Sequence, residues 1–286
     1  MKDLIYVQNM DDLHKLFNVS GSSHPLMSVI DFSKVHGEVQ HGTKITSDLY
    51  AVIFKHYCKN NLKYGRKSVD FREGHLICIA PNQIVEIDNE NEEKDEKMGY
   101  GLFFHPDLIR STSFSDKIKK YTFIYYEVSE ALHLSENEKT IITDCILKIQ
   151  TEMQENNNVH SHHIIIYAIE LLLNYCLRFY GRQLMTRSIT NRPIVAKVEN
   201  ILTNYFGENL AREEGLPSVK YLANKANLSP SYLSDLLRKE TGKNAQEQIH
   251  FFIIEEAKNF LLNSEKNVSE IAFDLGFEYP QYLNKL

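Results

Sequence analysis

The sequence predicts an α+β protein in which an N-terminal antiparallel β-domain precedes a domain made entirely of helices. Three observations lead to this prediction. The chain of 286 residues is longer than one typical domain of ~150 residues. Short strand-like segments separated by turn signals occupy residues 26–109. After Ile109 the apolar residues recur with the helical period of about 3.6 residues instead of the strand period of two.

Six segments of the first domain are rich in β-branched and aromatic residues and lie between turn signals such as Pro81-Asn82. They are Leu26–Phe32, Tyr50–Tyr57, Lys67–Phe71, His75–Ala80, Ile84–Ile87 and Met98–Phe104. Strands at this spacing predict an antiparallel sandwich or a small barrel. The acidic run 88–97 (DNENEEKDEK) interrupts the pattern and is expected to form a solvated hairpin loop.

Two helices are predicted to follow the strands. A capping box of Ser135 and Glu138 begins the first, whose apolar stripe reaches Met153. The second, from about Ser161, is apolar on more sides than one buried face requires, so part of it is expected to meet a partner chain. A small, polar segment that ends in proline then predicts a linker. The expected divisions are a first domain 1–133, a helical segment 134–187, a linker 188–193 and a helical domain 194–286.

Charge and cysteine content narrow the function classes. The net charge is −6, and residues 191–286 carry 11 basic and 13 acidic side chains, so DNA binding there would depend on locally placed groups and have modest affinity. The cysteines form no Cys-x-x-Cys pair, which argues against a zinc ribbon or a disulfide framework and for reduced, mostly buried thiols in a cytoplasmic protein. They are Cys58, Cys78, Cys145 and Cys176. No apolar run approaches the ~20 residues of a membrane span, so none is expected.

The last third of the chain contains an internal repeat. Residues 219–228 (VKYLANKANL) recur 49 positions later as 268–277 (VSEIAFDLGF), and 232–236 (YLSDL) recur after 50 positions as 282–286 (YLNKL). Each copy has an alanine where two helices would cross closely, followed by Asn227 or Gly276, which tolerate the left-handed conformation that ends a helix. Ser229 and Pro230 are suited to begin the next helix as N-cap and first residue. Each copy therefore predicts a helix-turn-helix, the alternative being a hairpin used only for packing.

A further helix over Asn244–Leu262 is predicted between the two copies. At ~1.5 Å per residue its 19 residues span about 28 Å. That length is close to the ~34 Å between successive major-groove faces of a duplex, so both units could enter adjacent grooves.

Residues from about Asn191 to the end resemble the double helix-turn-helix DNA-binding domain of the AraC-type bacterial transcription regulators. The resemblance rests on 228–234 (LSPSYLS), 238–242 (RKETG) and 268–277 (VSEIAFDLGF). It implies two recognition helices, the first over Pro230–Lys239 and the second from Tyr279 or Pro280. The base-facing residues would be Ser231, Ser234 and Asp235 in the first and Tyr279, Gln281, Asn284 and Lys285 in the second.

Side-chain chemistry is compatible with most of these positions. Glutamine and asparagine can bind adenine edges, serine can bind any base, and the Asp235 carboxylate accepts only from cytosine N4. The phosphate contacts would come from Ser229, Arg238, Lys239 and Lys243. Because the sequence stops at Leu286, inside the expected second recognition helix, the second unit is expected to be truncated.

The same resemblance implies a cupin-like N-terminal domain that binds an unidentified small-molecule effector, and homodimerisation through residues 135–187. Candidate effector-pocket residues are Tyr50, Phe54, His56, Tyr57 and Arg66, although core packing explains them equally well. No catalytic arrangement, metal-ligand set or cofactor motif is found, so no enzyme, metal or cofactor is expected. The expected function is sequence-specific binding of double-stranded promoter DNA under effector control. The alternatives are a ligand- or protein-binding module with impaired DNA binding and a cupin-type metalloenzyme.

Overall fold

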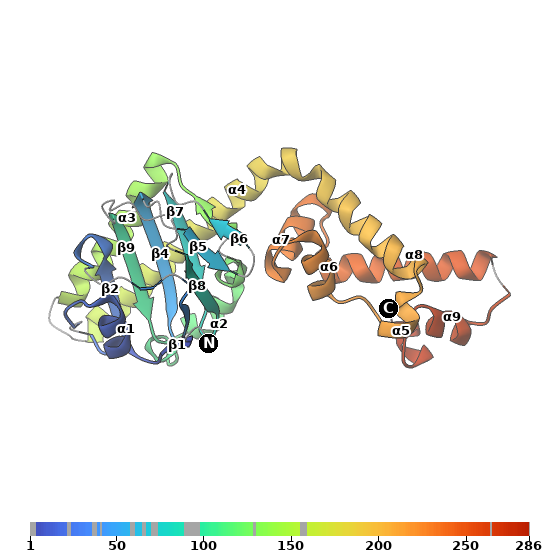
Figure 1. Ribbon diagram of the computed structural model, residues 1–286, viewed down its shortest axis with the longest axis horizontal. Coiled ribbons are helices and arrows are strands. Elements are labelled where there is room, and N and C mark those ends of the chain that lie inside the picture. The colour runs from blue at the N-terminus through green and yellow to red at the C-terminus, as the bar shows by residue number, and fades with distance from the viewer. Residues whose placement is uncertain are drawn as a thin grey trace. The chain divides into compact units, whose positions relative to one another are not determined.

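The computed structural model describes residues 4–21, 24–35, 39–40, 42–57, 61–64, 67–69, 74–88, 98–127, 130–154, 159–263 and 265–285. The chain forms two compact units, Met1–Gln183 and Leu184–Leu286 (Figure 1). The first unit holds the β-sheets and the second is helical, which confirms the predicted α+β class.

The first unit is built on two five-stranded sheets. Sheet A has the order β1 (Leu4–Val7), β3 (Lys44–Ser47), β8 (Ile84–Asp88), β5 (Asn61–Tyr64), β6 (Lys67–Val69). Sheet B has the order β10 (Leu132–His133), β7 (His75–Ile79), β4 (Tyr50–Tyr57), β9 (Met98–Phe104), β2 (Met27–Asp31). Neighbouring strands pair antiparallel except for β1 and β3, which pair parallel.

The six predicted strands correspond to β2, β4, β6, β7, β8 and β9. The sequence analysis missed β1, β3, β5, β10 and the helix α1 (Met10–Phe17). The missed strands have four residues or fewer, too short for an alternating pattern to stand out, and pairing with neighbours far along the chain stabilises them instead. The acidic run falls outside the described residues apart from Asp88, where β8 ends.

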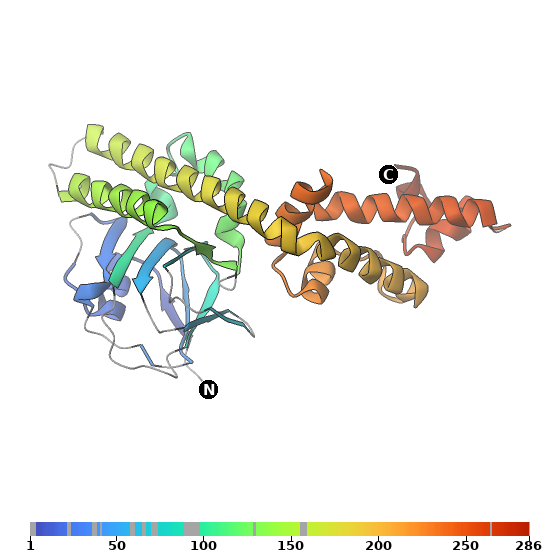
Figure 2. The ribbon, with the colours of Figure 1, turned by 90° about the horizontal axis from the view of Figure 1, so that it is seen from above.

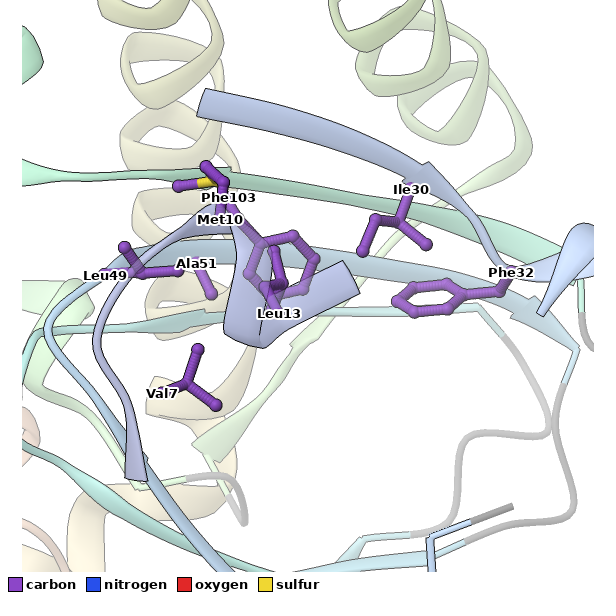
Figure 3. Packing of buried hydrophobic residues seen from close by; sticks show 8 residues of the cluster. All are labelled: Val7, Met10, Leu13, Ile30, Phe32, Leu49, Ala51 and Phe103. Carbon is purple, nitrogen blue, oxygen red and sulfur yellow. The ribbon is translucent and has the colours of Figure 1, made fainter. Parts of the chain in front are cut away.

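Apolar side chains fill the space between the two sheets. Figure 3 shows one cluster in which α1 and β1 pack against strands of sheet B. Its buried members are Val7, Met10, Leu13, Ile30, Phe32, Leu49, Ala51 and Phe103. A second cluster joins Ile77 of sheet B to Val85 of sheet A, so the unit is a sandwich with its main core between the sheets.

Helices α3 (Glu136–Gln154) and α4 (Val159–Gly207) lie side by side over the other face of sheet B (Figure 2). Cys78 of β7 is buried beside Cys176 of α4, and its cross-strand partner Val52 is buried on the same face. Burial raises the pKa of the Cys78 thiol well above its ordinary value, which keeps it protonated and unreactive. Among the described residues Cys78, Cys145 and Cys176 are free and buried, as expected, and Cys58 lies outside them.

Hydrogen bonds fix the start of α3 and attach α4 to it and to the sheet. Ser135 and Glu138 form the predicted capping box, with Glu138 Oε2 accepting from the Ser135 amide at 2.9 Å. The Arg182 guanidinium of α4 then donates to both oxygens of Glu138, at 2.8 and 3.0 Å, and to the carbonyl of His133 at 2.7 Å. This bidentate pair joins α4 to the start of α3 and to strand β10.

The predicted linker is wrong about local structure, because the backbone of residues 188–193 belongs to α4. A proline inside a helix removes one hydrogen bond and bends the helix, but helix-forming flanks on both sides can outweigh its cost. The boundary between the two compact units falls between Gln183 and Leu184 in the chain, a few residues before the predicted linker.

The apolar part of α4 was also underestimated. By length and composition the segment His160–Met185 could cross a membrane, with a mean hydropathy of 1.4, although the sequence analysis found no such stretch. Residues of this segment such as Ile169 and Leu172 are completely buried. A helix that covers a sheet in this way has the same composition as a membrane span, so this feature is weak evidence for a membrane.

Short helices complete the first unit, and the second contains the last part of α4 and, among the described residues, six further helical elements. The former are η1 (Phe32–Lys34), η2 (Pro106–Leu108), α2 (Phe114–Lys117), η3 (Ile118–Lys120) and η4 (Thr122–Tyr125). The latter are α5 (Leu210–Glu214), α6 (Val219–Ala226), α7 (Pro230–Thr241), α8 (Ala245–Asn263), α9 (Val268–Asp274) and η6 (Pro280–Lys285).

Candidate functional site

The two copies of the repeat have the same turn. Asn227 after α6 and Gly276 after α9 adopt positive φ angles of 61° and 88°. The amide of Leu228 donates to the carbonyl of Ala223 at 2.9 Å, and in the second copy Phe277 donates to Ala272 at 2.9 Å. This pattern closes the end of a helix with a left-handed residue and reverses the chain. It confirms that the repeat in sequence is a repeat in structure.

Small residues let the helices of each unit approach closely. Ala223 and Ala272 are completely buried, as predicted from their place in the repeat. At Gly276 the space is tighter still, because a Cβ atom there would lie 2.5 Å from the carbonyl oxygen of Ala211 in α5. Only glycine fits both the φ angle and this contact.

Ser229 begins α7 as the predicted N-cap. Its Oγ accepts a hydrogen bond from the amide of Tyr232 at 3.2 Å, and Pro230 occupies the first turn. The side chain is only 2% exposed. The predicted phosphate contact of Ser229 therefore disagrees with the structure, because the oxygen that caps the helix is enclosed.

The remaining predicted residues of α7 lie on its outer side. Tyr232, Leu233, Leu236 and Leu237 form the buried side. Ser231, Ser234, Asp235 and Arg238 follow the helical spacing on the opposite side and are half-buried or exposed. This polar surface is the side of α7 that is open to a ligand.

Cations gather where α7 ends. Arg238 and Lys239 are exposed in its last turn, and Gly242 closes the helix with a φ angle of 77°. Lys243 follows, with Nζ 3.8 Å from the centre of the Phe251 ring of α8. The cation–π contact holds this lysine near the other two, so three positive charges lie within six residues.

The second recognition helix differs from its prediction. Residues 280–285 form the 3-10 helix η6 instead of an α-helix. A stretch of six residues that starts with proline makes few α-helical hydrogen bonds, which favours the tighter form. Tyr279, Gln281 and Lys285 are exposed, and the side chain of Asn284 lies outside the described residues.

Helix α8 between the units has the predicted length of 19 residues. Its start is fixed by reciprocal hydrogen bonds, since Asn244 Oδ1 accepts from the Glu247 amide at 2.9 Å and Glu247 Oε2 accepts from the Asn244 amide at 2.7 Å. Both helix-turn-helix units pack against it, α7 at one part and α9 at another.

An ion-pair network that was not predicted from the sequence lies beside the second helix-turn-helix unit. Asp274 of α9 accepts hydrogen bonds from Lys266, at 2.6 Å, and from Arg212 of α5. Burial raises the pKa of the Asp274 carboxyl. The hydrogen bonds from Lys266 and Arg212 lower it by more than burial raises it, so the pKa lies below its ordinary value. The sequence marked this site in one way: Asp274 of the second copy occupies the position that Lys225 has in the first copy of the repeat.

The predicted effector residues do not surround one cavity. A cavity of about 90 Å³ lies between the sheets, and from β4 it is lined by Ala51 and Ile53. Tyr50 and Phe54 alternate with these residues and therefore point to the opposite face, where Tyr50 stacks on Phe104. The side chains of His56 and Tyr57, and all of Arg66, lie outside the described residues.

We predict that Gly276→Ala lowers the free energy of unfolding of the helical domain more than Gly242→Ala does. Both glycines have a positive φ, which costs an alanine about 1–2 kcal/mol. A Cβ at position 242 meets nothing within 4 Å, whereas at position 276 it must displace the backbone of α5, which adds about 1–3 kcal/mol. Denaturant unfolding followed by circular dichroism measures the difference, and equal losses of free energy would contradict the close contact.

Comparison with known proteins agrees with the helix-turn-helix geometry of the helical domain. The chain matches a family described as "Helix-turn-helix domain" over residues 222–286. No curated protein matched the chain. The C-terminal domain of the two-component response regulator yesN from Fusobacterium nucleatum is 29% identical, over 31% of this chain and 86% of that domain, with a TM-score of 0.25.

Two structures of ToxT from Vibrio cholerae extend over 91% of this chain. One, in a P21 crystal form, is 12% identical over 92% of ToxT with a TM-score of 0.31. The other, bound to an unsaturated fatty acid, is 11% identical over 89% with a TM-score of 0.27. The assignment rests on the family match and on the two equivalent turns. Residues 222–286 therefore form a helix-turn-helix domain.

Proposed function

We propose that this protein is a sequence-specific transcription regulator that binds double-stranded promoter DNA with its two helix-turn-helix units. The observation that carries the proposal is the repeated turn, which sets a polar, outward-facing helix on the first unit and η6 at the equivalent place in the second. A second helix held in this way can enter the major groove while the first crosses the backbone.

The proposed contacts follow from side-chain chemistry and, for every residue except Asn284, whose side chain lies outside the described residues, from the structure. Base edges are assigned to Ser231, Ser234, Asp235, Tyr279, Gln281, Asn284 and Lys285, and phosphates to Arg238, Lys239 and Lys243. Ser229 is left out because its oxygen is buried. Since the helical domain has no excess of basic residues, these local cations supply most of the electrostatic attraction.

We predict that Arg238→Ala weakens binding to promoter fragments from the protein's own gene region and lowers the slope of log K against log salt by about one, because one phosphate contact is lost. Fluorescence anisotropy across a salt series measures both quantities. Lys258→Ala is the matched control, because Lys258 is exposed on α8 and paired with Glu255. If Arg238→Ala loses binding without a change in slope, Arg238 does not contact a phosphate. If the wild type shows no salt-sensitive binding, the alternative of a ligand- or protein-binding module is favoured.

We also propose that the protein is a homodimer joined through α4. The inner side of this helix covers sheet B, while Ile164, Tyr167 and Leu171 form an outer apolar stripe in which Tyr167 is 66% exposed. Polar groups border the stripe, with Lys117 and Glu170 paired at 2.8 Å. A helix with two apolar sides suits a self-complementary contact with a second copy of the same helix.

Leu171→Glu is expected to convert the dimer to a monomer at micromolar concentration, because a charge enters the apolar contact. Lys148→Glu, on the exposed side of α3, serves as the control and should leave the mass unchanged. Light scattering after size exclusion gives the mass directly. A dimer that survives Leu171→Glu would place the interface elsewhere.

An effector is assigned to the cavity between the sheets. Its lining is largely apolar, with Thr46, Ser47 and Gln83 as polar groups at the wall. A volume of about 90 Å³ is below the ~300–1,000 Å³ of common ligand sites, so the effector we propose is small and apolar.

The cavity assignment predicts that a small apolar molecule copurifies with the wild type and is reduced by Ala51→Leu, which fills the cavity. Mass spectrometry of the denatured protein identifies the molecule and its occupancy. Val29→Leu on neighbouring β2 controls for added volume outside the cavity. Equal occupancy in the wild type and Ala51→Leu would rule out this cavity as the site.

The proposed role requires neither catalysis nor a cofactor, and it places the protein in the cytoplasm with the DNA it binds. Effector binding can change promoter occupancy only if the effector has different affinities for two arrangements of the protein.

A further inference from the structure

Two cations converge on one carboxylate beside the second helix-turn-helix unit. Lys266 Nζ lies 2.6 Å from Asp274 Oδ2, and the Arg212 guanidinium donates to Asp274 Oδ1. The Asp274 side chain is 11% exposed, whereas the side chains of Arg212 and Lys266 are 53% and 41% exposed, so the carboxylate is enclosed while both cations reach solvent. We refer to Arg212, Lys266 and Asp274 as the Asp274 clamp.

The clamp joins three separate parts of the second unit. Arg212 belongs to α5, Lys266 lies in the connection between α8 and α9, and Asp274 is the last residue of α9. Helix α5 also touches the turn, because the Ala211 carbonyl lies against Gly276. Tyr205 Oη donates to the carbonyl of Gly215 at 2.9 Å and holds the other end of α5. Thus α5 is a fixed support against which the clamp sets the end of α9.

Among the residues that the structure describes, the first helix-turn-helix unit has no equivalent clamp. The repeat places Lys225 where Asp274 stands, and Lys225 Nζ lies 5.5 Å from the centre of the Tyr221 ring. There, Lys197 Nζ donates to the carbonyl of Ala226 at 3.0 Å and closes the end of α6. Helix α9 has seven residues, and helices this short are not stable without tertiary contacts. The end of α9 is therefore held by the clamp, whereas the end of α6, a helix of eight residues, is held by Lys197.

We propose that Asp274 is a positioning residue for DNA binding, which orients the second helix-turn-helix unit through Arg212 and Lys266 without touching DNA. This inference rests on the proposed function. Its electrostatic consequence is distinctive. Removal of a negative charge from a DNA-binding protein normally tightens binding, whereas loss of the Asp274 charge is expected to weaken it.

The test compares Asp274→Asn with Glu278→Gln by footprinting the full chain on a promoter fragment. The two variants remove the same charge, but Glu278 is exposed and lies outside the clamp. Gln281→Ala and Ser234→Ala assign each half of the footprint to one unit. Asp274→Asn is expected to lose protection in the second unit's half at concentrations that still protect the first half, with affinity about 10-fold lower, because an asparagine amide group opposes one of the two cations. Glu278→Gln should bind as well as the wild type or better.

Hydrogen exchange provides a readout that does not require DNA. In Asp274→Asn the amides of Leu275, Gly276 and Phe277 should exchange faster, while that of Leu228 in the first unit keeps its protection. Lys266→Met, which removes one exposed arm of the clamp, is the second variant if Asp274→Asn does not fold, and it should show the same pattern to a lesser degree.

The outcomes separate the two proposals. No footprint from the wild type would overturn the proposed DNA binding, and hydrogen exchange alone would then decide whether the clamp holds α9. Unchanged exchange at 275–277, or equal loss of protection in both halves of the footprint, would overturn the positioning role.

Discussion

A residue in the left-handed conformation directly after the first helix is the constraint on which both helix-turn-helix units depend. Asn227 and Gly276 both meet it, and in each unit the amide of the next residue, Leu228 or Phe277, donates to the carbonyl five residues back, of Ala223 or Ala272. The reversal brings the next helix against the first, and the alanines make the close contact possible. Without this backbone geometry, the polar sides of α7 and η6 would have no defined direction.

The two units share this turn but are supported differently. The first has a full recognition helix, an N-cap at Ser229 and cations at its end. The second combines a shorter first helix with a glycine pressed against Ala211 and a carboxylate held by two cations. Because the helical domain has more acids than bases, the placement of single charges matters more than their sum. Asp274 illustrates this, since its charge is neutralised within the fold.

The first unit shows which parts of a β-domain can be predicted from one sequence. Six strands were identifiable because β-branched and aromatic residues concentrate between turn signals. Strands such as β1 and β3 were not, since pairing over a long sequence distance rather than local composition stabilises them. The prediction that Tyr50 and Phe54 line an effector pocket disagrees with the structure for a related reason. Tyr50 and Phe54 were chosen by residue type, whereas period two put Ala51 and Ile53 at the cavity and turned the aromatic residues toward the opposite face.

The sequence by itself determined the class of fold, the helix-turn-helix repeat, the caps and the turn residues. These features depend on interactions within about ten residues, which leave a local signature. Only the tertiary structure decided that residues 188–193 continue α4, that Ser229 is enclosed, and that Arg212 and Lys266 meet at Asp274. Arg212 and Asp274 are 62 positions apart in the chain. Contacts at such separation arise when packing brings helices together, and no spacing in the sequence marks them.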